Sequence, residues 1–276
     1  MLLRLLPGIR FLRLPAVLTV PGDVWVGAAL GGTGYSGSVL VSVGCAYLYG
    51  MALNDIVDEP DDRIHRPERP LPSGQIPKTG AVVLCLLLAI LAFLVHPGKG
   101  LLLLLGWITA YTFLKNTHLL FAAFLMSACR CTVLWIGAGT PDRLTSLWPF
   151  FALWGGIILF ITVLADQEGK PEVSGENGSL VLTGIFFFSP LLALYVGRPR
   201  FLLFLPWTLL AVLALQNYRK IRKQGHVTPA NIGQWLSMLI PLQAVFLMSM
   251  APAWKGLILL ALWPCLRWSV RKMQIS

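Results

Sequence analysis

Long apolar runs separated by short polar stretches make up almost the whole chain. Ten of these runs approach the roughly 20 residues that a helix needs to cross the hydrocarbon core of a bilayer. Gly and Pro occur inside several runs, and membrane helices tolerate them where neighbours satisfy the freed backbone groups. We therefore predict helices over residues 16–35, 37–57, 80–96, 99–115, 118–139, 145–165, 179–197, 200–218, 232–251 and 254–270.

The predicted fold class is all-α, a polytopic membrane protein with about nine or ten transmembrane helices around a central cavity. The number is nine or ten because the last two runs could form one re-entrant pair. Composition agrees, with a mean hydropathy of +0.72, 56% hydrophobic residues and 12% charged residues. A water-soluble domain of this size would cover its core with charge. Here the charges fall into a few short clusters, and we predict one integral membrane domain over residues 1–276.

The basic residues indicate how the chain is oriented. If the N-terminus is cytoplasmic and every span crosses once, 16 of the 22 Lys and Arg residues lie on the cytoplasmic side, as the positive-inside rule requires. We therefore predict a multi-pass protein with both termini in the cytoplasm, in the inner membrane if the source is a bacterium. The net charge of +10 then reflects topology and anionic membrane lipids as partners, and no nucleic acid is predicted.

Half of the twelve Asp and Glu residues fall between Asn54 and Gly74, in the sequence NDIVDEPDDRIHRPERPLPSG. Asp55, Asp58 and Asp62 follow helical spacing, so a continuing helix would place their oxygens on one face at the membrane edge. One interpretation is a solvated acidic loop paired with nearby arginines. The other is binding of a Mg²⁺-diphosphate, because hard oxygen ligands suit Mg²⁺ and the following RPLPSG supplies a base on a Pro-rich turn.

Pro60 leaves the geometry of this stretch open. It removes one helical hydrogen bond and clashes with the carbonyl four residues earlier, so the helix is expected to kink or to stop before Asp62. Asp61 would then be an alternative metal ligand.

Two charges are predicted to lie deep in the membrane, Asp23 in the first run and Arg130 in the fifth. An ionisable residue inside a membrane is costly and therefore suggests a functional site. Under that interpretation Asp23 contacts a polar acceptor and Arg130 contacts a diphosphate. The alternative is that the two residues pair with each other, or face a water-filled cavity, for structural reasons.

Three stretches resemble a known family. Asn54-Asp55-x-x-Asp58-x-x-x-Asp62, followed by Arg69-Pro70-x-x-Ser73-Gly74, resembles the first aspartate-rich motif of the UbiA superfamily of intramembrane prenyltransferases, with the spacing of its chlorophyll-synthase-like members. YTFLK, from Tyr111 to Lys115, resembles the Tyr-x-x-x-Lys that ends the family's fourth helix, and LADQEG resembles the start of its second aspartate motif. Within the superfamily, LPAVLTVPGDVWVGA and the CR at Cys129-Arg130 resemble the EboC-like branch.

The resemblance implies a ring of helices around a central cavity, in which a prenyl group passes from an isoprenyl diphosphate to an unidentified acceptor. It implies Mg²⁺ as cofactor, held by Asn54, Asp58 and Asp62 with Asp55 in support. Arg69 and Lys115 would bind diphosphate oxygens directly. Aromatic candidates for stabilising the allylic cation are Trp25, Tyr47, Tyr49, Trp107, Tyr111 and Trp154.

The second aspartate motif departs from the family pattern. It reads Asp166-Gln167-Glu168-Gly169-Lys170, with a lysine where the last aspartate usually stands. We therefore predict one firmly held Mg²⁺ on the Asn54 side and a second half made of Asp166, Glu168 and Lys170. Lys170 would contact the diphosphate as a point charge or, alternatively, form a salt bridge with Asp166. The residues on which catalysis is expected to depend are Asp58, Asp62 and Asp166.

Other classes of membrane protein fit the sequence less well. A transporter should carry interrupted helices with matched charges at the midplane, whereas the main polar cluster here lies at one membrane face. The Asp-Gly…Ala-Arg…Gly pattern of CDP-alcohol phosphotransferases is absent. The serious alternative is a non-catalytic membrane protein that binds or moves a lipid diphosphate. The sequence indicates neither the prenyl chain length nor the oligomeric state.

Overall fold

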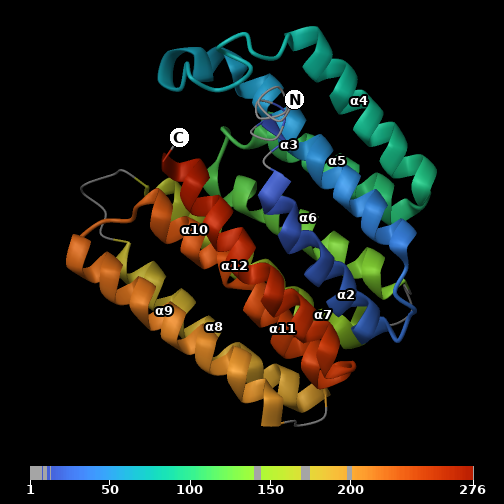
Figure 1. Cartoon of the computed structure of the whole chain (residues 1–276), viewed down its shortest axis with the longest axis vertical. Coiled ribbons are helices and arrows are strands. Elements are labelled where there is room, and N and C mark those ends of the chain that lie inside the picture. Colours follow the sequence, from blue (N-terminus) through green and yellow to red (C-terminus); the bar gives the residue numbers. More distant parts are fainter. Residues whose placement is uncertain are drawn as a thin grey trace.

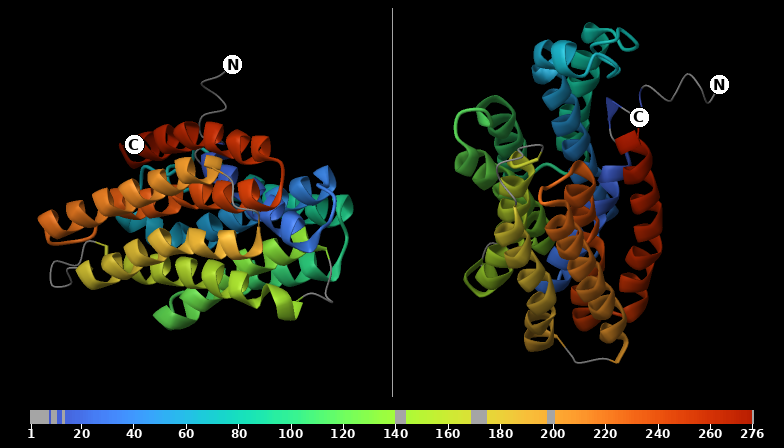
Figure 2. Two further views of the ribbon diagram at one scale, coloured as in Figure 1. Left: turned by 90° about the horizontal axis from the view of Figure 1, so that it is seen from below. Right: turned by 90° about the vertical axis from the view of Figure 1, so that its left-hand side faces the viewer.

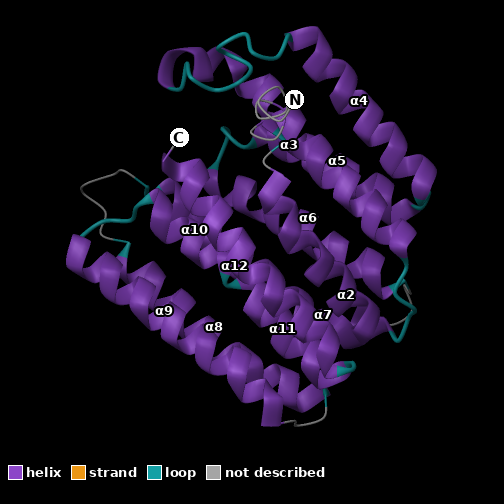
Figure 3. Ribbon diagram, viewed as in Figure 1, coloured by secondary structure: helices purple, strands orange, loops and turns teal. Residues whose placement is uncertain are grey.

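The computed structural model describes Gly8, Phe11, Leu12 and residues 14–139, 144–168, 175–197 and 201–275. Every regular element within these ranges is a helix (Figure 3), which confirms the all-α class. The elements in chain order are η1 Leu14–Thr19, α2 Val20–Gly31, α3 Gly37–His65, α4 Lys78–Val95, α5 Lys99–Leu114, α6 Leu119–Ala138, α7 Leu144–Asp166, α8 Glu176–Val196, η3 Phe201–Leu203, α9 Phe204–Gln224, α10 Pro229–Ser237, α11 Leu239–Met250 and α12 Ala253–Ile275.

Ten helical segments of the described chain are apolar enough to lie in a membrane. Seven of them have the length and hydropathy of a full span, and three shorter apolar helices cover Val17–Gly31, Lys99–Leu114 and Ala253–Pro264. Each coincides with one of the ten runs predicted from the sequence. Many large apolar side chains on the outer helices are exposed, including Leu86, Leu94 and Phe188, and a lipid environment would cover them.

Several helices differ from the predicted boundaries: α9 ends at Gln224 instead of residue 218, and α12 at Ile275 instead of residue 270. Two further differences involve proline. α3 does not stop near residue 57 but continues through Pro60 to His65, so the whole first motif is helical. The predicted span 232–251 is instead two helices that meet at Met238. Pro241 has no N–H to donate to the carbonyl of Ser237, which is the last residue of α10, and the helix is interrupted there.

The C-terminal half of the molecule has a filled interior. Figure 1 shows α8 and α9 at one side, α4 at the other, and α2, α6 and α10 to α12 between them. Every residue of α11 except Met250 is buried, and its side chains join a core with residues of α7, α8 and α9. α12 lies along one flank, over α11 (Figure 2). The space for a ligand therefore lies in the N-terminal half.

Helices α2 and α6 approach each other very closely, and glycines make this possible. A Cβ built on Gly27 or on Gly31 would lie 2.1 Å from a backbone oxygen of α6, that of Leu134 or of Ala138. On α6, a Cβ on Gly137 would lie 2.4 Å from the backbone oxygen of Val24. Gly27 and Gly31 form the small-xxx-small pattern by which membrane helices pack closely.

Candidate active site

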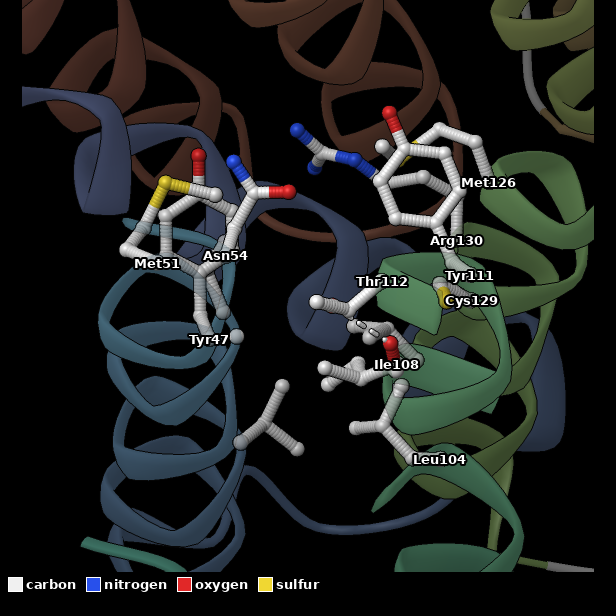
Figure 4. Close-up of a pocket in the computed structure, with 14 residues that line it drawn as sticks. Tyr47, Met51, Asn54, Leu104, Ile108, Tyr111, Thr112, Met126, Cys129 and Arg130 are labelled. Carbon is white, nitrogen blue, oxygen red and sulfur yellow. Dashed lines mark hydrogen bonds between the residues drawn. The ribbon is translucent and has the colours of Figure 1, made fainter. Parts of the chain in front are cut away.

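A cavity of about 180 Å³ lies between α2, α3, α5 and α6. Its polar groups are gathered at one end, where Asn54 and Arg130 lie, and apolar side chains such as Leu104 line the opposite end (Figure 4). The described lining residues are Val20, Val43, Tyr47, Gly50, Met51, Asn54, Leu104, Ile108, Tyr111, Thr112, Met126, Cys129, Arg130 and Val133. The shape and lining suit a ligand with a charged head and a hydrocarbon tail.

The continuous helix α3 and the end of α5 build the mouth of this cavity. Asn54 Nδ2 donates to Asp58 Oδ2 at 2.8 Å, as expected for residues four apart on one helix. Lys115 directly follows Leu114, the last residue of α5, and its side chain reaches across to α3. Its Nζ donates to Asn54 Oδ1 at 2.7 Å and to the two carboxylate oxygens of Asp58 at 2.6 and 2.5 Å.

A hydrogen-bonded turn after α3 positions Arg69. The backbone N–H of Ser73 donates to the carbonyl of Arg69 at 3.0 Å, and buried Leu71 anchors the turn in a small apolar core against α3 and α4. Arg69 Nη1 donates to Asp62 Oδ2 at 2.5 Å and lies 3.9 Å from Asp55 Oδ1. Asn54, Asp58, Asp62, Arg69 and Lys115 together line one polar pocket at this end of the molecule.

The remaining acids of the motif have other partners. Asp61 is exposed, and its carboxylate lies 3.3 Å from His65 Nδ1. Because α3 continues through Pro60, Asp62 keeps the helical register with Asp55 and Asp58. Asp61 lies at the exposed edge of the same polar pocket. Glu59 is buried and pairs with Arg63 and with Lys78, the latter at 2.9 Å.

Mg²⁺ fits the chemistry of the Asn54–Asp58 pair. Oδ1 of Asn54 and the carboxylate of Asp58 converge on one position, which a cation, the Lys115 ammonium, already takes. Among the described residues, no group of three His, Cys, Asp or Glu side chains is placed to hold a metal. Mg²⁺ is usually held by one or two carboxylates together with substrate phosphates. The donor set therefore suits a Mg²⁺ ion that arrives with a diphosphate.

The second motif is only partly described. Asp166 is the last residue of α7 and is exposed, and Glu168 follows it in a turn. Burial raises the pKa of Glu168, and the nearby charge of Arg66 opposes that increase. Glu168 therefore lies within electrostatic reach of the loop that follows α3. Lys170, predicted to contact the diphosphate, falls outside the described residues.

The two intramembrane charges form an ion pair. Arg130 Nη1 donates to Asp23 Oδ2, and its Nη2 donates to Thr19 Oγ1 at 2.8 Å. Asp23 is 1% exposed, and its Oδ1 accepts from Trp154 Nε1 at 2.8 Å and from Gln243 Nε2 at 2.6 Å. Arg130 lines the cavity and Asp23 does not, so the pairing foreseen from the sequence is present while the two residues occupy different environments.

The aromatic candidates divide into two groups. Tyr47 and Tyr111 line the cavity. Trp154 instead donates a hydrogen bond to Asp23, and Tyr49 shares a hydrogen bond with Thr109 at 2.8 Å. Trp25 and Trp107 form edge contacts with Tyr35 and Phe124. Sequence reasoning missed Gln243, although a glutamine inside a predicted apolar span is the kind of signal that identified Asp23.

Comparison with known proteins gives one family. Residues 17–239 match the model of the UbiA prenyltransferase family. The diterpene cyclase eriG of Hericium erinaceus is 28% identical over an alignment of 205 residues. The match covers 65% of this chain, and the chain spans 65% of that protein's length. The EboC-like branch stays a prediction.

Solved structures share the fold. The apo structure of a UbiA homolog from Aeropyrum pernix K1 matches with a TM-score of 0.63 and 16% identity, over 85% of this chain and 98% of that one. A UbiA homolog from Archaeoglobus fulgidus bound to DMAPP and Mg²⁺ matches with a TM-score of 0.55 and 16% identity, over 92% and 98%. At these identities the likeness is one of architecture.

Proposed function

Because the chain belongs to the UbiA prenyltransferase family, we propose that it transfers a prenyl group from an isoprenyl diphosphate to an acceptor, with Mg²⁺, at the cytoplasmic face of the membrane. The observation that carries the proposal is the meeting of Asn54, Asp58 and Lys115 at the polar end of an apolar cavity. The polar end suits a diphosphate, and the apolar interior suits a hydrocarbon tail.

Each residue at the mouth has a distinct task. Asn54 and Asp58 would hold Mg²⁺, and Asp62 holds Arg69 in place through their hydrogen bond at 2.5 Å. Arg69 and Lys115 bind diphosphate oxygens, because charge-assisted hydrogen bonds to phosphate are short and strong. Mg²⁺, when bound, neutralises the charge that develops on the leaving diphosphate.

The cavity protects the reactive end of the prenyl chain. Leu104, Ile108 and Val133 exclude water, which would otherwise capture an allylic cation. The rings of Tyr47 and Tyr111 face the same space and supply π surfaces that stabilise a cation. The mouth and the interior therefore serve the two halves of one substrate.

Cyclisation of the prenyl chain is a second candidate, suggested by the similarity to a diterpene cyclase and by a largely apolar cavity. It uses the same diphosphate departure and needs no acceptor. A protein that only binds a lipid diphosphate is the third.

One experiment separates these candidates. Purified protein in lipid nanodiscs is incubated with labelled geranyl or geranylgeranyl diphosphate and a cell metabolite extract, with and without Mg²⁺, beside an Asp58→Asn variant. We expect Mg²⁺-dependent release of pyrophosphate, a prenylated product that forms only with the extract, and loss of both in the variant. A cyclic hydrocarbon without the extract would indicate cyclisation. Stoichiometric binding without turnover would contradict an enzymatic function.

A further inference from the structure

The apolar end of the cavity is closed by packed side chains. Figure 4 shows Leu104 at the end that lies farthest from Asn54. Val43 and Leu104 line the cavity, are 1% and 2% exposed, and belong to one apolar cluster. Leu101, one turn deeper on α5, is 1% exposed and belongs to the same cluster without lining the cavity. A hydrocarbon tail that enters from the mouth therefore ends against this cluster.

The helices around the cavity meet one turn beyond this end. A Cβ built on Gly137 of α6 would lie 2.4 Å from the backbone oxygen of Val24 on α2. A Cβ built on Gly100 of α5 would lie 2.9 Å from Cγ1 of Ile136 on α6. Such close contacts hold α2, α5 and α6 together at this level, so the end of the cavity is fixed by backbone packing as well as by side chains.

The cavity is also short. Val43 lies eleven residues before Asn54 on α3, and Leu104 lies eleven residues before the residue that follows α5 and reaches the mouth, Lys115. At about 1.5 Å per residue, either helix gives a depth of about 16 Å. The proposed diphosphate site takes the first turn, at Asn54, so the tail begins near Gly50 and about 10 Å remain to Val43.

Length and volume set similar limits on the tail. An isoprene unit adds four bonds to the length of a chain, or about 5 Å at the spacing of an extended polypeptide backbone, so two units fill the remaining length. A cavity of about 150 Å³ holds one benzene molecule, which is about 25 Å³ per carbon. The cavity of about 180 Å³ then takes about seven carbons, which suits a ten-carbon tail whose first carbons lie at the mouth.

We infer, on the basis of the proposed function, that the isoprenyl diphosphate carries a tail of two isoprene units, and that Val43 and Leu104 set this length. A third unit has to displace these buried side chains, and overpacking of a buried cluster is unfavourable. Beyond their Cβ atoms the two side chains contain five carbons, the number in one isoprene unit. The same limit counts against cyclisation of a twenty-carbon chain inside this cavity.

The test measures how tail length affects binding. Dissociation constants of the unreactive thiolo analogues of dimethylallyl, geranyl, farnesyl and geranylgeranyl diphosphate are measured in nanodiscs with Mg²⁺, and are corrected for the partition of each analogue into empty nanodiscs. We expect the wild type to bind the geranyl analogue about tenfold or more tightly than the two longer ones. The double variant Val43→Ala with Leu104→Ala, which makes room for one more unit, should bind the farnesyl analogue at least as tightly as the geranyl analogue.

Two further variants make the test independent of the stability of the double variant. Leu104→Phe adds three carbons and creates no void, and it should weaken the geranyl analogue relative to the dimethylallyl analogue by about tenfold or more. Leu102→Ala, on the same helix with its side chain 55% exposed, is the control and should keep the wild-type preference.

Two results would overturn the inference. One is a wild type that binds the farnesyl analogue as tightly as the geranyl analogue, as expected if the tail leaves the cavity sideways into lipid. The other is an unchanged preference in Leu104→Phe or in the folded double variant. Failure of the wild type to bind any of the analogues with Mg²⁺ would instead count against the proposed function.

Discussion

Lys115 places its ammonium between the oxygens of Asn54 and Asp58, which we propose as metal ligands. Both the ammonium and the Asp58 carboxylate are largely buried, with side-chain exposures of 15% and 23%. A free Mg²⁺ ion must displace this ammonium and shed water, which Mg²⁺ does reluctantly. A diphosphate gives the displaced ammonium new oxygens, so metal and diphosphate should bind together.

This coupling can be measured with Mn²⁺ and inorganic pyrophosphate in place of the natural ligands. We expect Mn²⁺ to bind the wild type at least about tenfold more tightly when pyrophosphate is present. Lys115→Ala should bind Mn²⁺ alone more tightly than the wild type and lose the enhancement by pyrophosphate. Lys78→Ala, which breaks the comparable pair with Glu59, is the control and should behave as the wild type. Equal Mn²⁺ affinity of the wild type with and without pyrophosphate would contradict the coupling.

Asp61 and Asp62 are neighbours in sequence but differ in environment. Both line the polar pocket, but Asp62 is 4% exposed and bonded to Arg69, whereas Asp61 is exposed and lies near His65. We expect Asp62→Asn to weaken pyrophosphate binding with Mg²⁺ by about tenfold or more, because Arg69 loses its charge-assisted partner. Asp61→Asn should change neither binding nor stability by more than about 0.5 kcal/mol. Isothermal titration and thermal unfolding of both variants test this, and equal losses would refute the assignment.

At the scale of elements, the position of the cavity depends on how closely α2 approaches α6. Gly27 faces the carbonyl of Leu134, and its replacement by Ala would force the helices apart or strain the backbone. Overpacking of this kind costs about 1 to 3 kcal/mol. The separation would also stretch the Asp23–Arg130 pair, which links the same two helices.

We therefore expect Gly27→Ala to lower the thermal unfolding temperature in detergent and to weaken Mg²⁺-dependent binding of a prenyl diphosphate, because the cavity lies between α2, α3, α5 and α6. Gly184→Ala on α8 is the matched control, because a Cβ there meets nothing within 4 Å. The control should bind as the wild type does and unfold at the same or a higher temperature, because Ala has a higher helix propensity than Gly. A Gly27→Ala variant with unchanged stability would mean that α2 can shift without cost.

Local pattern was sufficient to predict where helices occur, and insufficient to predict where they end. Apolar runs and turn residues located all ten segments, because every segment that lies in the bilayer must be a long apolar run. The end of α3 was wrong by two turns, since the exposed Pro60 loses only one hydrogen bond and the polar residues after it extend the helix into water. The break at Met238 depends on the buried Pro241, whose effect sequence alone did not reveal.

At the scale of the whole molecule, the site combines residues that sequence order keeps apart. The motif on α3 was visible as a spacing of oxygens, and a resemblance supplied Arg69 and Lys115 as its partners. Asp23 and Arg130 were recognisable as costly charges, with their pairing only one of the open alternatives. Trp154 and Gln243 approach Asp23 from 131 and 220 residues away, and no local periodicity specifies such contacts.

The orientation of the whole protein in the membrane is the remaining prediction. In Figure 1, α3, α9 and α12 run toward the same end of the molecule, where the mouth of the cavity also lies. The basic C-terminal residues of α9, Arg222 and Lys223, are at that end, and the positive-inside rule places such residues in the cytoplasm. The diphosphate would then enter from the cytoplasm.

Reporter fusions test this arrangement directly. Alkaline phosphatase, which is active only outside the cytoplasm, should be inactive when fused after Gly74 or after Gly225 and active after Gly197, at the opposite end of α8 and α9. A fluorescent protein that matures only inside the cell should give the reverse pattern. Inverting the charge of the α9 end, with Arg219, Lys220, Arg222 and Lys223 all replaced by Glu, should weaken the bias at Gly225. Phosphatase activity after Gly74 in the unaltered protein would place the mouth of the site on the outer face, and the diphosphate would have to come from there.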